Sequence, residues 1–298
     1  MLVLLGGLAR GAEPLPPADL VNVAYGPHER HRLDLWRAPV EGVTPVLVFI
    51  HGGGWHGGDK SSLPIELLHA MRAAGIAVAS INYRFTSIAR LPGPVHDAAR
   101  AVQFLRSQAS AWRLDPARVG AVGVSAGGCS ALWLACHDDL ASPQDPDPVR
   151  RQSTRLRVAV GYSPQTSLDP KEVVGWIGEE VLKHPMIQRA IGAKKREDIL
   201  GRYEEHGALL RECSPLAHVS KDDPPMLLTF PTMGPLPAAN PGNAIHHAVF
   251  GLKLQQAAVA VGVECVLRLE DAPGGAPTPA AFLLRHLQAS RDARASGR

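Results

Sequence analysis

The sequence Gly123-Val124-Ser125-Ala126-Gly127 lies near the middle of this 298-residue chain. An apolar stretch typical of a strand, 118–122, precedes it, and a run of small and apolar residues typical of a helix, 128–136, follows it. A serine in such a strand-turn-helix setting is raised above the edge of a sheet, where its hydroxyl can react. Glycines flank it because the turn is too tight for side chains. We therefore predict a nucleophile elbow with Ser125 as the nucleophile.

A second glycine-rich turn lies upstream. His51-Gly52-Gly53-Gly54-Trp55 follows the apolar run 45–50, which is typical of a buried parallel strand. Backbone N–H groups in such a turn are bare and can bind an oxyanion that develops during acyl transfer. The sequence predicts an oxyanion hole made by the amides of Gly53, Gly54 and Ala126.

Two further motifs extend the pattern: Asn82-Tyr83-Arg84 after a predicted strand, and Asp115-Pro116-Ala117-Arg118 before the elbow strand. Together with the two turns, they resemble the esterase/lipase type of α/β-hydrolase, close to the hormone-sensitive-lipase-like and feruloyl-esterase-like carboxylesterases. The resemblance covers residues 20–288. It implies an α/β-hydrolase fold, with a mostly parallel central sheet flanked by helices, and a small-molecule ester or acyl ligand. It implies no cofactor and no metal.

Strand and helix patterns alternate along the chain, as expected for a parallel α/β sheet. The predicted strands are 31–36, 46–50, 76–83, 118–122, 156–162, 226–230 and 263–269, and the predicted helices include 64–74, 94–109 and 278–287. The alternation breaks between residues 163 and 213, where helical, charge-rich segments occur. The resemblance implies a helical cap insertion there, over the site.

The usual partners of the serine are missing from their expected positions. In this fold the acid follows the strand 226–230 and the histidine follows the strand 263–269, in the order serine, acid, histidine. No Asp or Glu occurs between residues 224 and 263, and Ala276 stands where the histidine is expected. His286 lies too far along the last helix.

Other residues are candidates for these two roles. Asp169 follows the strand ending at residue 162, where some members of the superfamily take their acid. His246 and His247 follow the loop after strand 226–230 and are candidate bases; His51 is implied to support the oxyanion loop. Two interpretations stay open. The protein is either a serine esterase that hydrolyses short esters slowly, or a catalytically silent protein that binds a ligand or partner in the pocket around Ser125.

Composition narrows the possible partners and kinds of site. A formal charge of +3 is too small to suggest a nucleic-acid partner. The four cysteines have no metal-site spacing and are expected to be buried free thiols, and the sequence leaves open whether Cys213 and Cys265 pair. No segment is long and apolar enough to cross a bilayer. The oligomeric state is not predicted.

The two ends differ from the rest of the chain. Residues 1–12 are compatible with the remnant of a signal peptide, although a basic leading segment is missing. Secreted or periplasmic and cytoplasmic locations are therefore both open. Residues 289–298 are small and polar, and a disordered tail is predicted there.

Overall fold

The computed structural model describes residues 14–288 of the chain. The predicted leader remnant (1–12) and the predicted disordered tail (289–298) lie outside these residues. Within them, no helix combines the length and the apolar character needed to span a bilayer.

One sheet of eight strands forms the centre of the molecule, with the order β1-β2-β4-β3-β5-β6-β7-β8. β1 pairs antiparallel with β2 and β2 antiparallel with β4, and every other neighbouring pair is parallel. The α/β-hydrolase fold with a mostly parallel sheet is therefore confirmed. The strands are β1 (Leu20–Ala24), β2 (Arg32–Trp36), β3 (Thr44–Ile50), β4 (Ala77–Ile81), β5 (Leu114–Val124), β6 (Val158–Tyr162), β7 (Met226–Phe230) and β8 (Cys265–Leu269).

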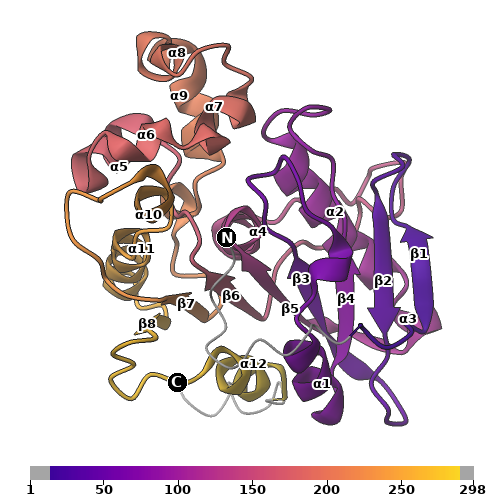
Figure 1. Cartoon of the computed structure of the whole chain (residues 1–298). Helices are drawn as coiled ribbons and strands as arrows, with labels where there is room; N and C mark the ends of the chain where they lie inside the picture. The colour runs from indigo at the N-terminus through magenta and orange to yellow at the C-terminus, as the bar shows by residue number, and fades with distance from the viewer. Residues whose placement is uncertain (1–13, 289–298) are drawn as a thin grey trace.

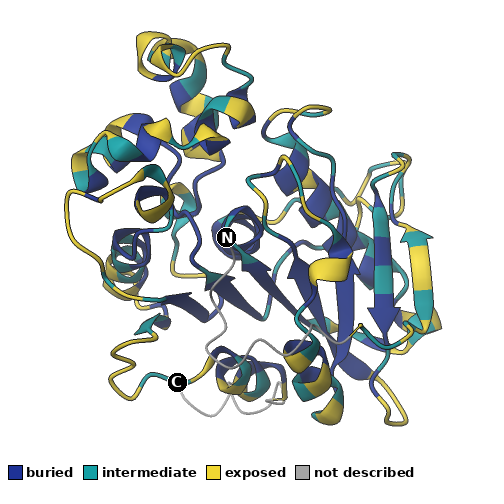
Figure 2. Ribbon diagram, in the orientation of Figure 1, coloured by how far each residue is buried: buried dark blue, intermediate teal, exposed yellow. Residues whose placement is uncertain are grey.

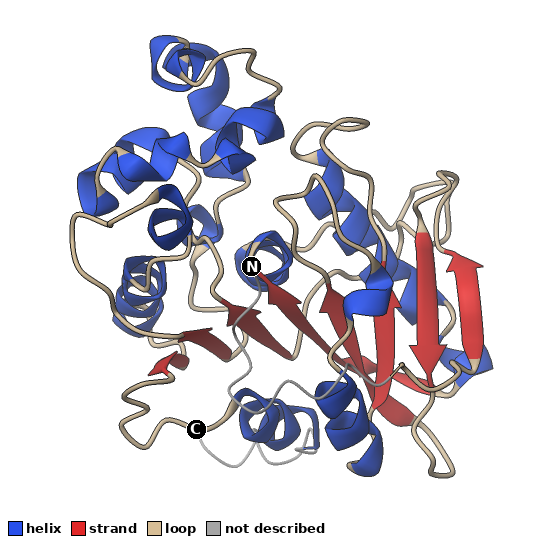
Figure 3. Ribbon diagram, viewed as in Figure 1, coloured by secondary structure: helices blue, strands red, loops and turns tan. Residues whose placement is uncertain are grey.

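Helices cover both faces of the sheet (Figure 1, Figure 3). One face carries α1 (Ile65–Ala73) and α12 (Pro279–Gln288), which contact each other. The other face carries α2 (Gly93–Ser107), the short α3 (Ala109–Trp112), α4 (Ala126–Cys136) and α11 (Val249–Ala260). α4 lies against β5 and β6 at the middle of the sheet and contacts α2 beside it.

The buried strand β3 explains why both faces are covered. Alternate side chains of a strand point to opposite faces. Val46, Val48 and Ile50 join the core under α2 and α4, whereas Leu47 and Phe49 join the core under α1 and α12. A strand that is apolar on both faces is stable only between two helical layers, and the central strands are accordingly buried along their length (Figure 2).

A set of short helices is inserted in the chain between the neighbouring strands β6 and β7. These are α5 (Pro170–Ile177), α6 (Glu180–Lys183), α7 (Pro185–Ile191), α8 (Glu197–Gly201) and α9 (Tyr203–Glu212), and a 3-10 helix, η2 (Pro215–His218), leads back toward β7. We call residues 163–213 the helical insertion. It gathers at the upper left of Figure 1, next to α10 (Pro241–Ile245), which contacts α6.

The predicted strands and helices all occur, with ends that shift by a few residues. β1 was not predicted: its sequence Leu-Val-Asn-Val-Ala lies at the sheet edge, mostly exposed or half-buried, so it lacks a buried apolar run. All four cysteines are buried free thiols, so Cys213 and Cys265 are not paired.

Candidate active site

Ser125 occupies the turn between β5 and α4. Its backbone is held at φ 52° and ψ −120°, an arrangement that costs a non-glycine residue energy and is typical of functional turns. The neighbours must be glycine: a Cβ at Gly123 would lie 2.2 Å from the Gly127 carbonyl oxygen, and one at Gly127 would lie 2.1 Å from the Ile50 carbonyl oxygen. The close contact with β3 forces the chain to turn sharply and presents the serine at the strand end.

A histidine lies against the serine hydroxyl. The Ser125 Oγ is 2.9 Å from Nε2 of His246, the residue that follows α10. The other ring nitrogen, Nδ1, is 3.0 Å from the Gly242 carbonyl oxygen, one turn earlier in the same segment. Since Nδ1 faces a carbonyl it carries the ring proton, which leaves Nε2 free to accept the proton of Ser125.

The local sequence explains why His246 stands there. The Asn240 side chain accepts a hydrogen bond from the Asn243 amide and caps the start of α10, and Pro241 occupies the first helical position. The helix ends after Ile245, which is buried together with Ala244. Docking of this short helix turns the His246 ring toward the elbow.

Partial burial favours the neutral form of the His246 ring. Desolvation lowers the pKa of His246 below its ordinary value, and the hydrogen bond to the Gly242 carbonyl opposes this only in part. The ring of His184 lies 6.2 Å away in an edge-to-face arrangement, and burial lowers its pKa as well. A neutral imidazole is the form that can remove a proton from serine.

The other candidates lie elsewhere. His247 is buried, and its Nδ1 accepts a hydrogen bond from the Val249 amide at 3.1 Å. Asp169 caps α5, and its carboxylate accepts hydrogen bonds from the Lys171 amide, the Tyr203 hydroxyl and the Arg211 guanidinium. Among residues 14–288, the Ser125 hydroxyl and the His246 ring form no hydrogen bond with either candidate.

The glycine-rich turn lies beside the elbow. Gly53 and Gly54 have φ values of 104° and 61°, in the left-handed region that favours glycine. Ala126 is the first residue of α4, and amides in the first turn of a helix have no partner within the helix. N–H groups at such positions can stabilise negative charge.

Buried aromatic groups hold this turn in place. The Tyr83 hydroxyl donates to the His51 carbonyl oxygen at 2.8 Å, and the two rings stack at 4.3 Å. Burial lowers the pKa of His51 to about 4, and its Nδ1 lies 2.8 Å from the Gly52 carbonyl oxygen. The Trp55 indole donates to the Ser130 hydroxyl of α4 at 3.0 Å. The turn is therefore tied to the same helix that carries Ser125.

Sequence reasoning missed three participants. The Gly242 carbonyl has no side chain to signal it. His184 and Met186, at the start of α7, approach the site from the helical insertion: the Met186 Cγ lies 3.5 Å from the point where a Cβ of Gly54 would stand. The sequence 240–241, Asn-Pro, is a helix-start signal that could have located α10 and thus His246.

Comparisons with known proteins identify the family of the chain. Residues 33–236 match the BD-FAE family model. The chain is 27% identical over 218 residues to a probable carboxylic ester hydrolase, LipM, and 28% identical over 215 residues to the esterase LipC, both from Mycobacterium tuberculosis. Each match covers 70% of this chain but only 46% and 49% of those relatives, so the chain spans about half of their length.

Solved structures share the fold. A truncated carbohydrate esterase from gut microbiota superposes with a TM-score of 0.72 at 18% identity, covering 93% of this chain and 100% of that one. An esterase from Thermogutta terrifontis, Est2, gives a TM-score of 0.61 at 22% identity and covers 85% of this chain and 82% of its own. At these identities the likeness concerns the fold.

Proposed function

Since the chain belongs to the BD-FAE family of α/β-hydrolases, we propose that it hydrolyses carboxylic esters with Ser125 as nucleophile and His246 as general base. The observation that carries the proposal is the 2.9 Å contact between Ser125 Oγ and His246 Nε2. This distance is within the reach needed for direct proton transfer.

The reaction proceeds in two halves. Ser125 Oγ attacks the ester carbonyl carbon while its proton passes to His246 Nε2, and the carbonyl oxygen becomes an oxyanion held by the amides of Gly53, Gly54 and Ala126. The tetrahedral species collapses, the carbon–oxygen bond to the alcohol breaks, and His246 gives the proton to the departing oxygen. Water then attacks the acyl carbon while His246 Nε2 takes its proton. The bond from that carbon to Ser125 Oγ breaks, the acid leaves, and His246 returns the proton to Ser125 Oγ.

The Gly242 carbonyl takes the orienting role that a carboxylate has in a Ser-His-Asp triad. It fixes the tautomer of His246 through Nδ1 at 3.0 Å. As a neutral dipole, however, it stabilises the imidazolium less than a full negative charge does. The arrangement therefore supports a Ser-His dyad in which the geometry suits proton transfer, but the driving force for that transfer is smaller than in a Ser-His-Asp triad.

The substrate side of the site supports a small ester. Met186 packs against the oxyanion turn at Gly54, and the His184 ring lies beside His246. Both come from α7, so the helical insertion acts as a cap that restricts the room above the serine. We therefore expect esters of short acyl chains to be hydrolysed faster than those of long ones.

The test is labelling with a fluorophosphonate probe, in which Ser125 Oγ bonds to phosphorus and fluoride leaves. The full chain should be labelled once, with the added mass on the peptide that contains Ser125. Ser125→Ala should abolish labelling, and His246→Ala should slow it strongly. No labelling of the wild-type protein would refute the proposal and favour a silent ligand-binding protein.

A further inference from the structure

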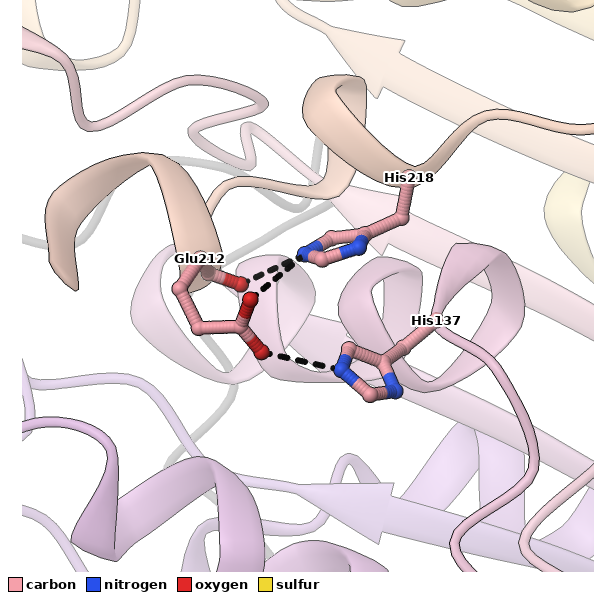
Figure 4. Close-up of side chains that lie close together, drawn as sticks. All are labelled: His137, Glu212 and His218. Carbon is pink, nitrogen blue, oxygen red and sulfur yellow. Dashed lines mark hydrogen bonds and ion pairs between the residues drawn. The ribbon is translucent and has the colours of Figure 1, made fainter. Parts of the chain in front are cut away.

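A second group of chemically active side chains lies at the opposite end of α4 from Ser125. His137 follows the last residue of that helix, Glu212 ends α9, and His218 ends η2 (Figure 4). Their ligand atoms, two imidazole nitrogens and a carboxylate oxygen, all lie within 4.8 Å of one another. At a rise of about 1.5 Å per residue, α4 separates this group from Ser125 by roughly 18 Å, so it is not part of the ester site.

Both ring nitrogens of His137 lie against oxygen atoms. Its Nδ1 lies 2.9 Å from the Asp138 carbonyl oxygen, and its Nε2 lies 2.9 Å from a Glu212 carboxylate oxygen. A ring nitrogen of His137 and a carboxylate oxygen of Glu212 therefore stand side by side, at positions that one metal ion could share.

The Glu212 carbonyl oxygen belongs to the same group and accepts a hydrogen bond from His218 Nε2, a bond that ligation of a metal by that nitrogen would replace. The His218 Nε2 is 2.6 Å from the Glu212 carbonyl oxygen and 3.9 Å from the other carboxylate oxygen of Glu212. That same carbonyl already accepts a hydrogen bond from the Trp133 indole at 2.9 Å. The C-terminal ends of α4 and α9 also meet here, and the carbonyl end of a helix carries partial negative charge.

We propose that His137, Glu212 and His218 bind a divalent transition metal, with Zn²⁺ as the best fit. Two imidazoles and one carboxylate suit zinc, whereas magnesium and calcium prefer oxygen ligands throughout. The Asp138 carbonyl holds His137 by Nδ1, as is usual for a metal-bound histidine. The two histidine side chains are 15% and 19% exposed and that of Glu212 is 47% exposed, so water can complete the coordination.

The ion would join three separate parts of the chain. It connects the end of the helical insertion and the return segment η2 to α4, the helix that follows Ser125. Its role is therefore structural: it fastens the last turn of α9 to the core of the molecule. This inference does not depend on the proposed ester hydrolysis.

The test is zinc binding to the full chain, freed of metal with a chelator and titrated with Zn²⁺ by calorimetry. We expect one ion per chain, and a loss of affinity of more than about 10-fold in Glu212→Gln and in His218→Gln, because even outer-shell partners shift metal affinity by 10–100-fold. His69→Gln, at an exposed histidine of α1, is the matched control and should bind as the wild type does.

Two measurements keep the result independent of folding defects. Circular dichroism should show wild-type helix content in both ligand variants, which alter largely polar, partly exposed side chains. Co²⁺ in place of Zn²⁺ should give the visible absorption of a low-coordinate site in the wild type and lose it in the variants. Absence of stoichiometric zinc binding, or wild-type affinity in either variant, would overturn the proposal.

Discussion

The contact between Ser125 and His246 is best tested with a double-mutant cycle. The changes are Ser125→Ala, His246→Ala and their combination. Because the 2.9 Å separation already lies within hydrogen-bond reach, His246 should accept the proton of Ser125 without any movement of either side chain. A positioned general base contributes about 10² to 10⁴ in rate. Because the neutral Gly242 carbonyl stands where a triad has a carboxylate, we expect a rate contribution near the middle of this range, about 10³-fold.

This factor corresponds to about 4 kcal/mol of transition-state stabilisation, at about 1.4 kcal/mol for each factor of ten. Since the two side chains act as one unit, each single variant should lose about 10³-fold in kcat and the double variant no more than that. The coupling free energy should therefore equal nearly the whole effect of one substitution.

The assay is the hydrolysis of p-nitrophenyl acetate, with kcat and KM measured separately. His247→Asn is the control at the neighbouring histidine, since the asparagine oxygen can still accept the hydrogen bond from the Val249 amide that Nδ1 of His247 now accepts. It should keep kcat within a few fold of the wild type. Wild-type kcat in His246→Ala, or losses that multiply in the double variant, would refute the reasoning.

Three further outcomes follow from the structure. Because burial lowers the pKa of His246 and the base must be neutral, kcat/KM should fall only as the pH drops below the ordinary histidine value of about 6.5; an acidic limb above that value would contradict this. Gly127→Ala, whose Cβ would lie 2.1 Å from the Ile50 carbonyl oxygen, should destabilise the fold by about 2 kcal/mol or more, measured by urea unfolding. Asp97→Asn removes the charge of a buried carboxylate bonded to the amide and guanidinium of Arg84. It should lower the free energy of unfolding by about 3 kcal/mol; an unchanged unfolding midpoint would show that the pair contributes nothing to stability.

Much of the fold could be predicted because its signals are local. The central strands are apolar on both faces, and runs such as 45–50 and 226–230 show this directly. The elbow and the oxyanion turn are also local, since glycines adjoining a strand mark close backbone contacts. β1 could not be predicted in this way because it is an edge strand with little buried surface.

The partners of Ser125 were harder to predict because they depend on tertiary packing. His246 was one of several candidates, and only the docking of α10 brings its ring to 2.9 Å from the serine. Its orienting group is a backbone carbonyl, which every residue possesses and no motif distinguishes. Asp169, the predicted acid, forms no hydrogen bond with His246. Its carboxylate caps α5 and accepts hydrogen bonds from Tyr203 and Arg211 instead.

If His246 is the base, as proposed, its bond to the Gly242 carbonyl makes its orientation independent of other parts of the chain. Both atoms belong to one short stretch of chain, so the orientation of the imidazole is set within residues 240–246. The loops after β7 and β8, which hold the acid and the histidine in related hydrolases, then carry no part of the proton relay. On the proposed mechanism, changes in either loop, 231–237 or 273–277, that leave α10 docked should keep the contact between Ser125 and His246.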